Sequence, residues 1–585
     1  MTKRLQRSLL IFFFAVIVAA TGLAYRAWRQ QRKAAPALVG VSPLPDLGRW
    51  PTELKERITA ATNEVATVPK PEEPLGQLAQ LYFANDYTAE AEKALRVLIR
   101  LQPENARWFY FLGTLRLRAK DNAEAEQFFS QTTKLAPDYA PGWLKWGDRL
   151  AVAGRWAEAQ RCFERCLSLR PADPEAKYAL AKLHFARGDD AAARQVLESL
   201  VQTDPRFQDA HVMLGDLYAR AGDATRATEQ RDFLRAGAPS PPNADPWIDE
   251  VYLLSYDAYR MQVFGGLRAQ AGQNEAALPY LQRAATLDPT DVDTRGLLAN
   301  AYIALGRLSD AERTLDDGLK SVPGNELLEA RTAQVLLKEQ RGEEALQRID
   351  HALSLKPDSA ILQRARGEVL QQLNRPAEAV NAFQEALRLD PISMEVQLNL
   401  GRCLLLLGRR EEGKAAVQRA HQLRPEEPDA LGMLATLALE DKQLDEAERY
   451  VEQLYQREPE RPQARELYAL VKLRKANALA EAGMNSQAEA VYLGGLKVNP
   501  GYGPLQGGLG MLYGKLHRFS EAQTCFKRYL ELSPSDPFGY ILLGSTYASV
   551  GQRENAQQIW SQGLAVAQQI KNEARAKQLE RLLSQ

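Results

Sequence analysis

The sequence predicts an all-α protein, a solenoid of about fourteen stacked helical hairpins. Prolines recur every 34 residues from Pro103 to Pro239 and again from Pro289 to Pro459, and Pro500 and Pro534 follow. Glycine or alanine stands 24 residues before each of these prolines, and again 12 residues before it. Both halves of each interval carry the apolar period of about 3.6 residues that is typical of an amphipathic helix. Because proline cannot continue a helix, it separates one hairpin from the next.

The third interval illustrates one hairpin. Residues 143–153 and 156–169 both have helical apolar spacing, and Gly154 lies between them. The small residues allow the paired helices to approach closely, and large residues eight positions before the proline, such as Phe163, are expected to fill the space between hairpins. One hairpin cannot bury its own apolar face, so the stack is the unit that folds.

This pattern resembles the tetratricopeptide repeat family, whose consensus contains W-x2-L-G-x2-Y, A-x3-F and P. The third repeat carries the residues Trp143, Trp146, Gly147, Ala159, Phe163 and Pro171. The thirteenth carries Gly510, Tyr513, Ala522, Phe526 and Pro534. The resemblance covers residues 70–568. It implies a right-handed superhelix whose concave groove holds extended or helical peptide segments.

The N-terminal residues 1–33 are predicted to be a membrane anchor. The run from Leu9 to Ala20 is entirely apolar, and basic residues flank it on both sides. The alternative is a cleaved signal peptide, with Gly22 and Ala24 as the small residues before the cut. The short basic tail favours a single-pass protein of the inner (cytoplasmic) membrane with a periplasmic body. Residues 34–69 are predicted to form a proline-rich tether that includes a short helix over 52–66.

Two irregular intervals divide the predicted array. Repeats 1–5 occupy residues 70–239, an aromatic insert 240–255, repeats 6–11 residues 256–459, repeats 12–14 residues 460–568, and a capping helix 569–585. The insert either packs its aromatic side chains on the solenoid or binds a partner, since inserts in repeat arrays often fall on the binding face. The seven extra residues after Pro459 predict a long helix over 462–482.

Composition and motifs argue against catalysis. Lys plus Arg and Asp plus Glu both number 74, so no net charge attracts a nucleic-acid backbone. There is no phosphate-binding loop, no nucleophile elbow and no zinc-protease motif. Cys162 and Cys166 are spaced four apart on one helix, without the further soft ligands that a metal would need. The sequence therefore predicts no enzyme activity, catalytic residue, cofactor, metal ion or small-molecule substrate.

The expected function is binding of other proteins. Carried over from the family, the concave wall includes Arg107, Tyr110, Arg118, Tyr178, Lys182, Phe185, Arg364, Glu368 and Arg402. The insert adds the candidate partner-binding residues Trp247 and Tyr252. We expect a membrane-tethered scaffold that binds peptide or helical segments during assembly of an envelope or export complex. The alternative is a non-catalytic accessory subunit of a polysaccharide-synthesis or secretion enzyme complex.

Overall fold

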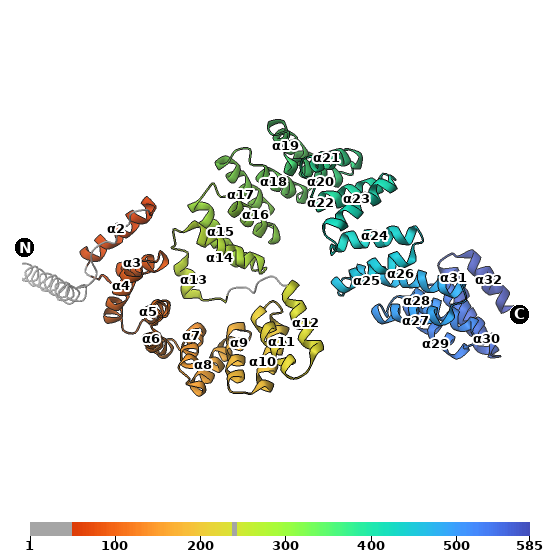
Figure 1. Ribbon diagram of the computed structural model, residues 1–585, viewed down its shortest axis with the longest axis horizontal. Helices are drawn as coiled ribbons and strands as arrows, with labels where there is room; N and C mark the ends of the chain where they lie inside the picture. Colours follow the sequence, from red (N-terminus) through yellow and green to blue (C-terminus); the bar gives the residue numbers. More distant parts are fainter. Residues whose placement is uncertain (1–49, 69, 237–242, 585) are drawn as a thin grey trace, which may run out of the picture. The chain divides into compact units, whose positions relative to one another are not determined.

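The computed structural model describes residues 50–68, 70–236 and 243–584, and in these ranges it contains 31 helices and no strand (Figure 1). The chain divides into two compact units, Met1–Val335 and Leu336–Gln585. The predicted all-α class is confirmed. None of the helices in the described ranges is long and apolar enough to cross a membrane. The predicted anchor, residues 1–33, lies outside those ranges.

The first unit begins with a single helix and continues with hairpins. The elements up to the insert are α2 Thr52–Thr67, α3 Glu72–Ala84, α4 Thr88–Leu101, α5 Ala106–Arg118, α6 Asn122–Leu135, α7 Ala140–Val152, α8 Trp156–Leu169, α9 Pro174–Ala186, α10 Asp190–Thr203, α11 Gln208–Arg220 and α12 Ala224–Ala236. After these come α13 Pro246–Tyr252, α14 Ala258–Gln270, α15 Asn274–Leu287, α16 Val292–Ala304, α17 Leu308–Ser321 and α18 Glu326–Lys338, which contains the boundary between the units.

The second unit continues the pairing of helices. Its elements are α19 Gly342–Leu355, α20 Ala360–Gln372, α21 Pro376–Leu389, α22 Met394–Leu406, α23 Arg410–Leu423, α24 Pro428–Glu440, α25 Leu444–Arg457, α26 Pro462–Glu481, α27 Asn485–Val498, α28 Gly503–Lys515, α29 Phe519–Leu532, α30 Pro537–Ser549, α31 Arg553–Gln569 and α32 Glu573–Leu583. Helix α26 has 20 residues, whereas its counterpart α24 has 13.

Helix α2 covers the first hairpin. Its apolar residues Leu54 and Ile58 are fully buried, and they belong to the same core cluster as Leu75 and Leu78 of α3. The apolar face of α3 is therefore not left open at the start of the array. An exposed apolar end would favour aggregation, which is why repeat arrays need a cap.

The small and large positions of the repeat meet within each hairpin. A Cβ atom added to Gly147 would lie 2.6 Å from Phe163, and one added to Gly367 would lie 2.5 Å from Phe383. Both phenylalanines are almost completely buried. The sequence predicted that these rings fill the space between hairpins. The structure seats each ring on the glycine of its own first helix, where the missing side chain leaves room for it. Phe163 also shares a core cluster with Ala179 and Leu183 of the next hairpin.

Candidate partner-binding surfaces

The insert packs on first helices of the N-terminal repeats. Asp245 caps α13, because its side chain accepts a hydrogen bond of 3.3 Å from the backbone N–H of Ile248. The same carboxylate accepts hydrogen bonds from the hydroxyls of Tyr110 on α5 and Tyr139 just before α7, the latter at 2.5 Å. The Trp247 ring stacks on that of Tyr139, with centroids 3.6 Å apart and planes 10° apart.

Cationic side chains of the repeats contact the same segment. Arg107 donates to Glu250 over 2.6 Å, and Arg118 donates to the hydroxyl of Tyr252. The three residues that the sequence assigns to the groove wall of repeat two, Arg107, Tyr110 and Arg118, thus all contact the insert. The insert residues Trp247 and Tyr252 are among their partners. The structure therefore places the predicted wall residues of repeat two in contact with the predicted partner-binding residues of the insert.

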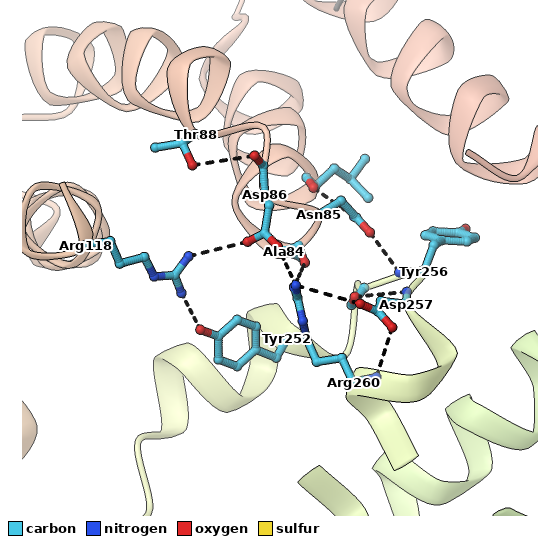
Figure 2. A network of polar contacts seen from close by, with 11 residues as sticks. Ala84, Asn85, Asp86, Thr88, Arg118, Tyr252, Tyr256, Asp257 and Arg260 are labelled. Atoms are coloured by element: carbon cyan, nitrogen blue, oxygen red, sulfur yellow. Dashed lines mark hydrogen bonds and ion pairs between the residues drawn. The ribbon is translucent and has the colours of Figure 1, made fainter. Parts of the chain in front are cut away.

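The far end of the insert joins repeat six to repeat one (Figure 2). The backbone N–H of Tyr256 donates to the side-chain oxygen of Asn85 over 2.8 Å. Arg260 on α14 donates to the Ala84 carbonyl over 3.0 Å and pairs with Asp86. Val251 of the insert and Tyr256, which directly follows the insert, belong to the core cluster formed by α2 to α6. This half of the insert is an integral part of the first unit.

Burial shifts the acid–base properties of the polar cluster around Asp245. Desolvation raises the pKa of Asp245 above its usual value, although the two tyrosine hydroxyls that donate to it act in the opposite direction. Desolvation and the neighbouring Asp245 also raise the pKa of Tyr110 well above its usual value, and that of Tyr139 rises for the same reasons. Both hydroxyls therefore stay protonated and remain donors to the carboxylate.

The predicted wall residues of repeat four make contacts within repeats four and five. The Lys182 ammonium lies 5.1 Å from the centre of the Tyr178 ring, and the ring of Tyr178 lies 5.3 Å from that of Phe207. The Arg220 guanidinium lies 4.5 Å from the Phe185 ring. Together these side chains form a row of cation–aromatic contacts across α9 and α11.

In the second unit, a hollow of about 690 Å³ lies over the first helices of three successive repeats, α22, α24 and α26. Its lining residues are Arg402, Leu405, Arg410, Pro428, Asp429, Gly432, Met433, Thr436, Leu437, Glu440, Leu454, Arg461, Gln463, Ala464 and Leu467. We call this feature the C-terminal hollow. Of its lining, only Arg402 is among the residues that the sequence singled out.

The long helix α26 supplies one wall of the C-terminal hollow. Gln463, Ala464 and Leu467 line it, and all three lie in the turns by which α26 exceeds the other first helices. The 41-residue interval from Pro459 to Pro500 was the sequence signal for this wall. That signal predicts a longer helix, but it does not show which surface the added turns border.

Arginines and one aspartate form part of the rim of the C-terminal hollow. Asp429 lies 3.6 Å from Arg402 and 3.2 Å from Arg461, so one carboxylate is shared by two guanidinium groups. The other two predicted wall residues of this unit, Arg364 and Glu368, are not in the lining. Arg364 forms ion pairs with Glu395 at 2.9 Å and with Glu368 at 3.8 Å.

The described ranges contain no group of three or more metal-ligating side chains. All four cysteines are buried, and burial raises the pKa of Cys162 and of Cys166 to about 12. Burial therefore disfavours the thiolate form of both residues, which is the form that acts as a nucleophile.

Comparison with solved structures finds many similar chains. The hetero-tetramer Cut9–Hcn1 of the APC/C is 14% identical over 89% of this chain and 98% of that one, with a TM-score of 0.29. Pseudomonas aeruginosa pilF is 24% identical over 36% of this chain and 96% of that one, with a TM-score of 0.31. Yeast Tom70 is 16% identical over 83% of this chain and 96% of that one, with a TM-score of 0.26. No curated protein matches the chain.

Models of protein families match several parts of the chain. Three models, each described as tetratricopeptide repeat, match residues 77–140, 150–206, 268–330, 364–428 and 504–536. The matched ranges lie in both units and on both sides of the insert. They follow the same helical hairpins that the 34-residue period predicts. The chain therefore belongs to the tetratricopeptide repeat family.

Proposed function

We propose that this protein is a membrane-tethered, non-catalytic scaffold that binds a segment of a partner protein in the C-terminal hollow. The observation that carries the proposal is the hollow itself, which is large enough for several side chains of a bound segment. Its membrane anchor would be residues 1–33, its tether residues 34–69, and its setting the assembly of an envelope or export complex. The apolar run between basic clusters supports that setting.

The chemistry of the hollow suits a peptide with apolar and charged side chains. Leu405, Met433 and Leu467 offer apolar surface, whereas Arg402 and Arg461 offer guanidinium groups that can exchange Asp429 for a partner's carboxylate. An apolar centre with a polar rim is the usual composition of a protein interface. Gly432 has no side chain, and the nearest atom to an added Cβ is 3.8 Å away. A bound segment can therefore approach the α24 backbone closely.

Filling the hollow should abolish partner binding. A photoreactive amino acid in place of Thr436, which is exposed and lines the hollow, should crosslink one defined partner in intact cells. Adding Gly432→Trp should reduce that crosslink at least about tenfold, because the indole would occupy the space of the bound segment. Since an added Cβ meets only ordinary contacts, the fold should be unaffected. The measurement is crosslinking followed by mass spectrometry.

The matched control carries the same photoreactive residue in place of Gln453. That residue is exposed on the neighbouring helix α25 and is not part of the lining. It should not crosslink the partner found from position 436. Equal crosslinking from both positions, or a crosslink that survives Gly432→Trp, would show that the hollow is not the binding site.

The proposed membrane anchor makes its own prediction. The full chain should stay with the membrane pellet after alkaline carbonate extraction, whereas a chain lacking residues 1–33 should be released, because about 20 apolar residues suffice to span a bilayer. Protease added to spheroplasts should degrade the body if it faces the periplasm. A mature protein that begins after Ala24 and is released without membrane disruption would instead identify a signal peptide.

A further inference from the structure

We propose that the N-terminal surface formed by Arg107, Tyr110, Arg118, Tyr139 and Arg170 is a recognition site for an acidic segment with an Asp-Pro-Trp helix start. Residues 243–250 of the chain itself are its resident ligand, and a partner carrying the same chemistry competes with them. This site is separate from the C-terminal hollow, so either proposal can fail without the other.

The contacts at the start of α13 resemble those of a bound peptide. Asp245 caps α13 and accepts hydrogen bonds from the hydroxyls of Tyr110 and Tyr139. One carboxylate therefore fixes the start of the helix and holds it on the surface. Pro246 then fixes the first helical turn. Trp247 stacks on Tyr139 and meets Tyr110 edge-on, with ring centroids 5.6 Å apart. An aromatic side chain seated among other aromatic rings is a typical anchor of a bound segment.

Charge complementarity supports the same occupant. Residues 243–250, NADPWIDE, contain three acidic residues and no basic one. The surface turns three arginines toward this segment and its continuation. Arg107 pairs with Glu250, Arg118 with Tyr252, and Arg170 donates to the Ala244 carbonyl over 2.7 Å. Only Arg107 meets a carboxylate, whereas Arg118 and Arg170 donate to neutral oxygens, so the surface recognises the segment by hydrogen bonds as well as by charge.

The two halves of the insert differ in how deeply they are buried. The side chain of Glu250 is 61% exposed, and an open hollow of about 640 Å³ lies between Trp247 and the turn that contains Pro103. By contrast, Val251 is fully buried and Tyr256 nearly so. Release of the first half would break the hydrogen bonds to Asp245 and the 2.7 Å ion pair between Asp249 and Arg268. The buried Val251 and Tyr256 would still join repeat six to repeat one.

The test measures binding of a fluorescein-labelled peptide, NADPWIDEVY, to the full chain by fluorescence anisotropy. The wild type should bind it weakly, because the resident segment competes at an effective concentration in the millimolar range. The double variant Trp247→Ala, Glu250→Ala should bind it at least about tenfold more tightly. Adding Tyr139→Ala to that double variant should remove the gain, as should replacing the peptide's tryptophan by alanine.

Two outcomes would overturn the proposal: equal peptide affinity for the wild type and the double variant, or a gain that survives Tyr139→Ala. Hydrogen exchange across residues 251–256 reports whether the double variant keeps the second half of the insert in place. If that protection is lost, the single variant Glu250→Lys is used in place of the double variant, because Glu250→Lys alters only the exposed ion pair with Arg107. It should also raise peptide affinity, and an unchanged affinity would count against the proposal.

Discussion

Replacing Asp245 by alanine should destabilise the first unit locally by about 3–7 kcal/mol. Loss of the helix cap costs about 1 kcal/mol, and each tyrosine hydroxyl that loses its charged acceptor costs about 1–3 kcal/mol. The hydroxyl of Tyr110 bears most of this cost because the residue is fully buried. Hydrogen exchange with mass spectrometry should show faster exchange in α5, α7 and α13, with α10 unaffected.

A matched control separates the two parts of this cost. Asp189 caps α10 through a hydrogen bond of 3.0 Å to the backbone N–H of Ala192, but it is exposed and receives no tyrosine hydroxyl. Asp189→Ala should therefore cost only about 1 kcal/mol. If Asp245→Ala costs no more than Asp189→Ala, the tyrosine cluster contributes nothing beyond the cap. Asp245→Asn should be intermediate, because the amide keeps an acceptor oxygen but loses the charge.

The second large effect concerns the packing of Phe383 on Gly367. Phe383→Ala should cost about 3–5 kcal/mol in the second unit, since a completely buried ring is replaced by a cavity. Gly367→Ala should cost about 1–3 kcal/mol, because the new Cβ would lie 2.5 Å from the ring. Denaturant unfolding of the full chain, with hydrogen exchange to locate the change in α20 and α21, measures both.

The double variant gives the sharper result. With Phe383→Ala in place, the clash disappears, and Gly367→Ala should become neutral or stabilising by up to about 1 kcal/mol, the difference in helix propensity. Gly494→Ala is the control in the same unit, since an added Cβ there meets nothing within 4 Å. It should be stabilising in both backgrounds. If Gly367→Ala costs the same with and without the ring, the two residues are not coupled through packing.

Much of the architecture was predictable because its information is local. A helix, a glycine or alanine at a close approach, and a proline that ends the hairpin all lie within 34 residues, and the pattern repeats often enough to be recognised. The helix before the array and the long helix after Pro459 also follow from local periodicity and spacing. Their positions in the structure, α2 and α26, agree with the predicted segments to within a residue or two.

The binding surfaces were only partly predictable because they depend on residues far apart in the chain. Family positions assign Arg107, Tyr110 and Arg118 to one groove wall, and in the structure all three contact the insert. No local pattern indicated that this surface contacts Asp245 and Glu250, which are more than a hundred residues away. In the second unit, Arg364 and Glu368 form ion pairs, whereas Gly432 and Met433, which no sequence argument selected, line the C-terminal hollow.

The sequence by itself determined that this chain is a tetratricopeptide repeat array, because each hairpin encodes its own helices and its fit to the next. Only the tertiary structure decided where the insert lies, that repeat six is joined to repeat one, and where the hollow forms. Tyr110, Tyr139 and Asp245 form a hydrogen-bonded cluster only once the chain has folded back on itself. The spacing of residues along the chain carries no information about such a contact.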